Sequence, residues 1–185
     1  TLISHAAGAL GTAGGGESTV TAISDDGAYV AFYSTAANLI VGGSDTNGVM
    51  DAFLWERATG IVTLISHQAG LATTAGDEIS YTTNGAMSAD GQRVAVYSNA
   101  TNLVAGATDV SATTDALLWD RSSDLLVYVS HLPGSPTAAA VARKAGPDNR
   151  WSRSAPVWAP PAARSSTPVT GIDARRPTPR ASSSA

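Results

Sequence analysis

Short apolar runs separated by polar clusters make up most of the first 132 residues of the chain. The runs are rich in β-branched and aromatic residues, and Gly, Asp, Asn and Ser gather between them, which is the pattern of strands joined by turns. In the first part of this region the pattern predicts four strands, at residues 19–24, 29–33, 52–56 and 61–66. No segment has a sustained helical period of apolar residues, so the sequence predicts an all-β fold.

The same strand pattern occurs twice in the sequence. Residues 23–34 (ISDDGAYVAFYS) align with 87–98 (MSADGQRVAVYS), and residues 50–67 align with 114–131, both at an offset of 64. The opening TLISH repeats the letters of residues 63–67. The sequence therefore predicts two complete units, at about 18–67 and 82–131, with residues 1–5 as the last strand of a preceding unit.

The letters of this repeat resemble those of a known family. SDDGAYVAFYS followed by DAFLWERATG resembles the WD40-like repeats called PD40, found in TolB-like β-propellers, and the long insertion NLIVGGSDTNG is similar to that of a bacterial subgroup. The resemblance covers residues 1–132 and implies β-propeller-type four-stranded antiparallel blades. Since a propeller has about four to eight blades, we expect an incomplete propeller, either a fragment or a unit that assembles with further copies.

Long connectors on one face are the first place to look for a binding site. Antiparallel strand order puts alternate connectors at opposite ends of a blade, so residues 35–50 and 67–80 are expected to share one face. Loops of this length on a rigid scaffold are where binding usually occurs. The sequence predicts that this long-loop face is the interaction surface.

An Asp-rich loop recurs on that face. Asp45, Asn47 and Asp51 fall within seven residues, and Asp109, Ser111 and Asp115 repeat the spacing. Several oxygen donors in a flexible loop suit Ca²⁺, which is the expected cofactor if these loops bind a metal. The favoured alternative is a pair of Asx-turns, in which the same side chains bond their own backbone. The second loop has Ser111 for Asn47 and Ala112 for Gly48, so its metal site is expected to be weaker.

Periodic His and Trp residues have structural explanations. His5, His67 and His131 recur at the end of the fourth strand, and they could form a metal-binding ring. The favoured interpretation is that each His bonds the backbone of the next blade. Trp55 and Trp119 occupy equivalent third-strand positions and are expected to pack between blades.

The chain has no recognisable catalytic motif. G-x-S-x-G and H-E-x-x-H are absent, and with no Cys there is neither a disulfide nor a thiolate metal site. No apolar run is long enough for a transmembrane helix. The sequence therefore predicts no catalytic residues and no enzymatic activity for this chain.

Charge divides the chain into two dissimilar regions. Residues 1–132 hold three Arg and thirteen acidic residues, whereas 133–185 hold eight basic residues and two acidic ones. The acidic region argues against a nucleic-acid partner. The Pro-, Arg-, Ser- and Ala-rich region 133–185 is expected to be a disordered tail. Two alternatives explain it: a basic tail that binds an anionic surface or an acidic partner, or a frameshifted continuation of the repeat.

These patterns together predict a non-enzymatic binding or scaffold module from an exported, periplasmic or extracellular, TolB-like propeller. Its expected partner is a protein or further propeller blades. The alternative is a propeller accessory domain of a secreted hydrolase whose catalytic domain lies outside this chain. A third alternative, suggested by the tail, is a non-functional pseudogene product.

Overall fold

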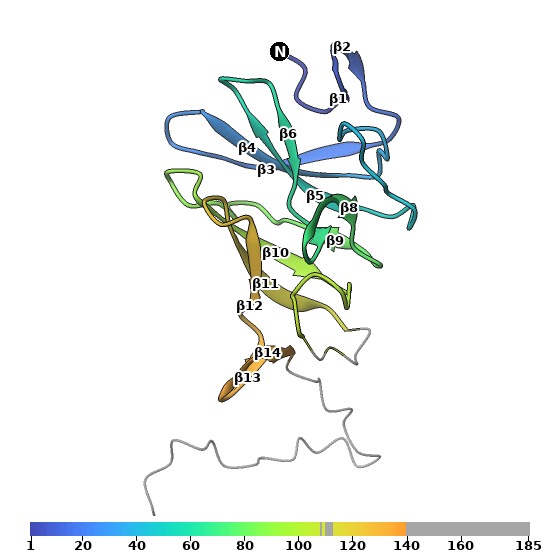
Figure 1. Cartoon of the computed structure of the whole chain (residues 1–185). Coiled ribbons are helices and arrows are strands. Elements are labelled where there is room, and N and C mark those ends of the chain that lie inside the picture. Colours follow the sequence, from blue (N-terminus) through green and yellow to red (C-terminus); the bar gives the residue numbers. More distant parts are fainter. Residues whose placement is uncertain (108, 110–112, 140–185) are drawn as a thin grey trace, which may run out of the picture. The chain divides into compact units, whose positions relative to one another are not determined.

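Figure 1 shows the computed structural model, which describes residues 1–107, 109 and 113–139. These residues contain strands, turns and no helix, so the all-β prediction is confirmed. Within this part of the chain, no helix could cross a membrane. Ser111 and residues 140–185, which include most of the predicted tail, lie outside the described residues.

Each repeat forms a four-stranded antiparallel sheet. The first sheet has the order β3 (Ser18–Ile23), β4 (Tyr29–Ser34), β5 (Asp51–Glu56), β6 (Val62–Leu64). The second has the order β9 (Ser80–Tyr81), β10 (Arg93–Ser98), β11 (Asp115–Asp120), β12 (Leu125–Tyr128). The strands predicted at 29–33 and 52–56 are present with one residue added, and those at 19–24 and 61–66 are shorter or shifted by one residue.

The Asp-Gly turns that join the first two strands explain why the chain reverses where it does. Ser24 Oγ donates a hydrogen bond to Asp26 Oδ1 (2.7 Å), and Gly27 follows with a φ of 64°. Ser88 and Asp90 make the equivalent bond in the second sheet (2.6 Å). The side-chain bond closes the turn, and glycine accepts the positive φ that such a tight turn needs.

The first strand of the second sheet is short because the segment between its paired serines is two residues longer than in the first sheet. Ser18 Oγ donates to Ser34 Oγ across a separation of 16 residues, whereas Ser80 and Ser98, which form the equivalent pair, are 18 residues apart. The β9–β10 ladder consequently has only two paired positions, and an isolated bridge continues it at Met87. This explains why the sequence pattern is less regular there.

Three short hairpins were not predicted from the sequence. They are β1 (His5–Ala6) with β2 (Ala9–Ala13), β7 (His67–Gln68) with β8 (Leu71–Ala75), and β13 (His131–Leu132) with β14 (Ser135–Ala139). Residues 1–4, expected in a strand, lie outside any strand. The connector expected at 67–80 contains the second hairpin. The repeat pattern, expected to stop at residue 131, continues through the third hairpin to Ala139.

Two apolar clusters hold the sheets. One covers a face of the first sheet and includes Phe32, Phe53 and Trp55. The other combines side chains of both sheets, among them Leu54 and Ile65 from the first repeat and Trp119 from the second. Trp119 thus packs between the sheets as predicted, whereas Trp55 packs on the face of the first sheet that is turned away from the second. The central strands β4 and β5 of the first sheet are buried on both faces.

The two sheets do not close into a ring within the described residues. Antiparallel four-stranded units in series are thus confirmed, and the propeller architecture stays a prediction.

Candidate functional site

The two long connectors meet beside the first sheet. Ser44, between β4 and β5, forms a parallel bridge with Thr74 of β8. The Ser44 N–H donates to the Thr73 carbonyl (2.9 Å), and the Ala75 N–H donates back to the Ser44 carbonyl (2.9 Å). The expectation that residues 35–50 and 67–80 share a face is confirmed.

Asp45 and Asn47 shape the connector by the turn geometry that the favoured alternative predicted. The Gly48 N–H donates to Asp45 Oδ1 (3.3 Å), and the Val49 N–H donates to Asn47 Oδ1 (2.9 Å). Asn47 also donates through Nδ2 to the Gly76 carbonyl (2.8 Å), just after β8. The two side chains therefore have structural roles whether or not a metal binds.

Asp51 has a different environment, since it starts β5 in the interior. Its side chain is only 1% exposed. Ser66 Oγ donates to Asp51 Oδ1 (2.7 Å) and accepts a bond from the Ala52 N–H (2.9 Å). The other carboxylate oxygen, Oδ2, is buried and has no hydrogen-bond partner. Burial is the main cause that raises the pKa of Asp51 to about 7; the Ser66 hydroxyl and the nearby Asn47 side chain oppose this rise, and the charge of Asp45 adds to it.

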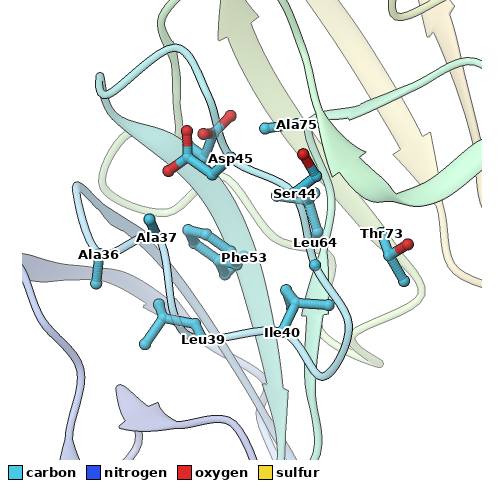
Figure 2. Close-up of a pocket in the computed structure, with 12 residues that line it drawn as sticks. Ala36, Ala37, Leu39, Ile40, Ser44, Asp45, Phe53, Leu64, Thr73 and Ala75 are labelled. Carbon is cyan, nitrogen blue, oxygen red and sulfur yellow. The ribbon is translucent and has the colours of Figure 1, made fainter.

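Asp45 and Asp51 line the same small cavity, of about 10 Å³. Figure 2 shows Asp45 at one end of this cavity and Leu39 and Ile40 at the other, with Phe53 between them. Leu64 also lines it. The volume corresponds to about one water molecule, and most of the side chains that line the cavity are apolar.

The second repeat has an equivalent buried corner, by which we mean the buried Asp at the start of the third strand, the Ser that bonds it and the acidic residue of the preceding loop. Asp115 is 3% exposed, and Ser130 Oγ donates to its Oδ1 (2.7 Å), while Oδ2 again has no hydrogen-bond partner. Burial raises the pKa of Asp115, and the charge of Asp109 adds to the rise. Asp109 therefore lies near Asp115 as Asp45 lies near Asp51.

One substitution distinguishes the two corners. Leu64 of the first repeat corresponds to Tyr128 in the second, and the Tyr128 hydroxyl donates to Asp109 Oδ2 (3.4 Å). Burial and the charges of Asp109 and Asp115 raise the pKa of Tyr128 above its ordinary value, so the phenol keeps its proton. The second corner thus has an internal donor where the first has a leucine.

The metal prediction stays untested. The structure brings Asp45, Asn47 and Asp51 together and places Asp109 near Asp115. Among the described residues, no three or more His, Cys, Asp or Glu side chains are grouped to hold a metal ion. A cation in the first corner would therefore need amide, carbonyl or water oxygens besides the two carboxylates.

The hairpin histidines contact the next sheet. His5 Nε2 lies 2.8 Å from the Gly60 carbonyl oxygen, as the favoured interpretation expected. His67 Nε2 lies 3.3 Å from the Asp124 carboxylate instead. Gly60 and Asp124 occupy the equivalent third turn of each sheet, and both have a positive φ (73° and 55°). These two histidines therefore join each hairpin to the sheet that follows it.

A hollow recurs between each of these hairpins and the next sheet. The first, of about 370 Å³, is lined by the β1–β2 hairpin, residues 39–41 and residues 59–62. The second, of about 290 Å³, is lined by the β7–β8 hairpin, Leu103, Ala105 and residues 123–126. These hollows could not be predicted from the sequence because the hairpins that form them were missed.

The serine that supports each buried Asp was also missed, although its spacing recurs. Ser66 follows Asp51 by 15 residues, and Ser130 follows Asp115 by the same interval. Comparisons with protein-family models, curated proteins and solved structures found no match to this chain.

Proposed function

We propose that this chain is a non-enzymatic scaffold module of an exported, TolB-like propeller, in which four-stranded sheets stack in series. On this proposal the outer face of the second sheet binds a further sheet of the same repeat. The long-loop face is the surface offered to a protein partner.

The supporting observation is a difference in burial between equivalent residues. Ile65 of the first repeat is 0% exposed, because it packs in the cluster between the sheets. Its counterpart Val129 is 60% exposed. Leu54 is buried in the same cluster, whereas Leu118 is only partly buried. The second sheet therefore exposes a face whose counterpart in the first sheet is covered by the second sheet.

Another pair of equivalent residues shows that this exposure is specific. Ile61 and Leu125 are 58% and 60% exposed, so a neighbouring sheet does not cover this position in the first repeat. A further sheet is therefore expected to bury the side chain at position 129 and to leave the side chain at position 125 exposed. Leu125 supplies the matched control.

The occupant that fits this face is a following repeat unit. Along the chain the β7–β8 hairpin joins the two sheets, and its Ala69 N–H donates to the Asn102 carbonyl (3.0 Å). In a head-to-tail contact between two copies, β13–β14 of one and β1–β2 of the other would compete for this position. A following unit brings no such competing hairpin.

The test is an extended chain in which a second copy of residues 76–139 is inserted after Ala139. The junction repeats the natural Ala75–Gly76 order, so the insert supplies one further sheet. We expect Val129→Asp to lower the thermal midpoint of the extended chain by several degrees, since about 1 kcal/mol corresponds to some 2–8 °C in domains of this size range.

The same substitution should leave the 185-residue chain almost unchanged, and Leu125→Asp should have little effect in either chain. If Val129→Asp has the same effect in both chains, no sheet has docked and the stacking proposal is wrong.

A further inference from the structure

The equivalent tryptophans of the two sheets differ in one hydrogen bond. In the second sheet, Trp119 Nε1 donates to Asp124 Oδ1 (3.0 Å). Its counterpart Trp55 is only 5% exposed, and the indole Nε1 has no hydrogen-bond partner among the described residues. A buried N–H group without an acceptor is unfavourable, so an acceptor that reaches Trp55 would stabilise the first sheet.

The difference comes from a substitution in the third turn. Gly60 of the first repeat corresponds to Asp124 in the second, so the first sheet has no side chain where the second supplies its carboxylate. Both residues have a positive φ (73° and 55°), so the two turns have similar backbones. What the first sheet lacks is therefore the carboxylate itself.

The position of this carboxylate lies at the hairpin hollows. Asp124 lines the second hollow, and Gly60 lines the first. Since Trp119 finds its acceptor in the lining of the second hollow, an acceptor for Trp55 is expected to come from the first.

The other residues around the first hollow are mostly apolar. Leu10 and Val41 line it. The second hollow has Ala72 and Ala105 at these positions. Leu10, Val41 and Ile61 are all exposed, so an apolar chain in the hollow would remove them from water. Among the described residues that line the first hollow, none is Asp, Glu, Lys or Arg, so no neighbouring acid repels an anion there.

We propose that the first hollow binds a carboxylate on a short apolar chain, and that one carboxylate oxygen accepts the Trp55 indole N–H as Asp124 accepts that of Trp119. The apolar chain packs against Leu10 and Val41, and burial of these side chains stabilises the complex. A neutral carbonyl accepts the same bond more weakly than a charged oxygen does. The ligand is a free aliphatic acid or the carboxyl terminus of a peptide that ends in an apolar residue. The proposal is independent of the stacking of sheets.

The indole N–H signals of the full 185-residue chain, in a proton–nitrogen NMR correlation spectrum, test the proposal. The Trp55 signal is assigned from Trp55→Phe. Millimolar hexanoate should shift this signal in a saturable way and leave the Trp119 signal unmoved, because Trp119 already has an acceptor. Hexanol, which lacks the carboxylate, should bind about tenfold more weakly. N-acetyl-leucyl-leucine represents the peptide source, and the tighter binder of the two acids identifies the source.

Gly60→Asp is the decisive variant because it copies the second sheet. It should shift the Trp55 indole signal without any ligand, and hexanoate should then leave that signal unchanged. If Gly60→Asp does not fold, calorimetric titration of Trp55→Phe replaces it. Trp55→Phe removes the donor and keeps an aromatic ring, so it should weaken hexanoate binding about tenfold. The matched control, Trp119→Phe, should leave hexanoate binding unchanged.

A Trp55 signal that neither acid moves at millimolar concentration would overturn the proposal, and the indole would then be met by water. Equal affinity for hexanol and hexanoate would also overturn it, since the hollow would then take apolar chains without a carboxylate.

Discussion

The two sheets have the same repeat and strand order but differ in what covers them. The first has apolar clusters on both faces, whereas the second shares only the cluster between the sheets. The register is the same: Val30 pairs with Trp55, and Val94 with Trp119. The repeat therefore specifies the strand order and register of each sheet, whereas the neighbouring sheet determines which of its residues are buried in a core.

The largest effect should come from placing a charge on the two equivalent faces. Ile65→Asp puts an unpaired charge between the sheets and should lower the free energy of unfolding by about 3 kcal/mol or more. Val129→Asp should stay within about 0.5 kcal/mol in the 185-residue chain. Urea denaturation of the two variants measures both. Equal losses would mean that the faces are not distinct in solution.

A smaller effect is expected at the polar edge between the sheets. Arg121 Nη1 donates to the Tyr29 hydroxyl (2.7 Å), and its guanidinium lies 4.1 Å from the centre of the Tyr29 ring. Arg121→Ala should therefore cost about 1–2 kcal/mol of unfolding free energy.

The matched control is Arg57→Ala, at the equivalent but exposed position of the first repeat; it should change stability by less than about 0.5 kcal/mol. Denaturant melts compare the two. A larger loss for Arg57 would contradict the contact between the sheets.

The smallest effect, equal in both sheets, concerns the Asp-Gly turns. The backbone N–H of Ala28 and the Ser24 hydroxyl lower the pKa of Asp26 below 3.8; the Ser88 hydroxyl and the Gln92 N–H lower that of Asp90. Because the folded pKa is lowered, the stabilisation is present above pH 3.8 and is lost as pH falls through the folded value.

Carboxyl-carbon NMR titration should show both groups ionising below the unfolded value. Ser24→Ala should move only Asp26 upward, and Ser88→Ala only Asp90. A shift of both groups by either variant would show that the two turns are coupled.

Local patterns predicted the strands well because their causes are local. The β-branched runs, the Ser-Asp-Gly turns and the duplicated spacing each specify a backbone state without help from the rest of the chain. The hairpins were missed because their strands are rich in Ala, Gly and Thr and have no apolar alternation. Their formation depends on contacts such as His5 with Gly60, 55 residues away.

The sequence predicted which residues form the candidate site but not their geometry. The sequence grouped Asp45, Asn47 and Asp51 by spacing and favoured Asx-turns, which Asp45 and Asn47 form, but it could not show that Asp51 is buried. The replacement of Leu64 by Tyr128 is visible in the alignment of the repeats, yet it has meaning only beside Asp109. The resemblance to PD40 repeats and ring closure stay predictions.

The histidine contacts have a consequence for how the chain folds during synthesis. The β1–β2 and β7–β8 hairpins are each held by a turn of the sheet that follows them along the chain, and for His5 that turn is 55 residues further along. While the chain emerges from the ribosome, a finished hairpin therefore lacks its histidine contact until nearly a whole further sheet has been made. The chain is expected to fold vectorially, with each newly completed turn fixing the hairpin that was synthesised one sheet earlier.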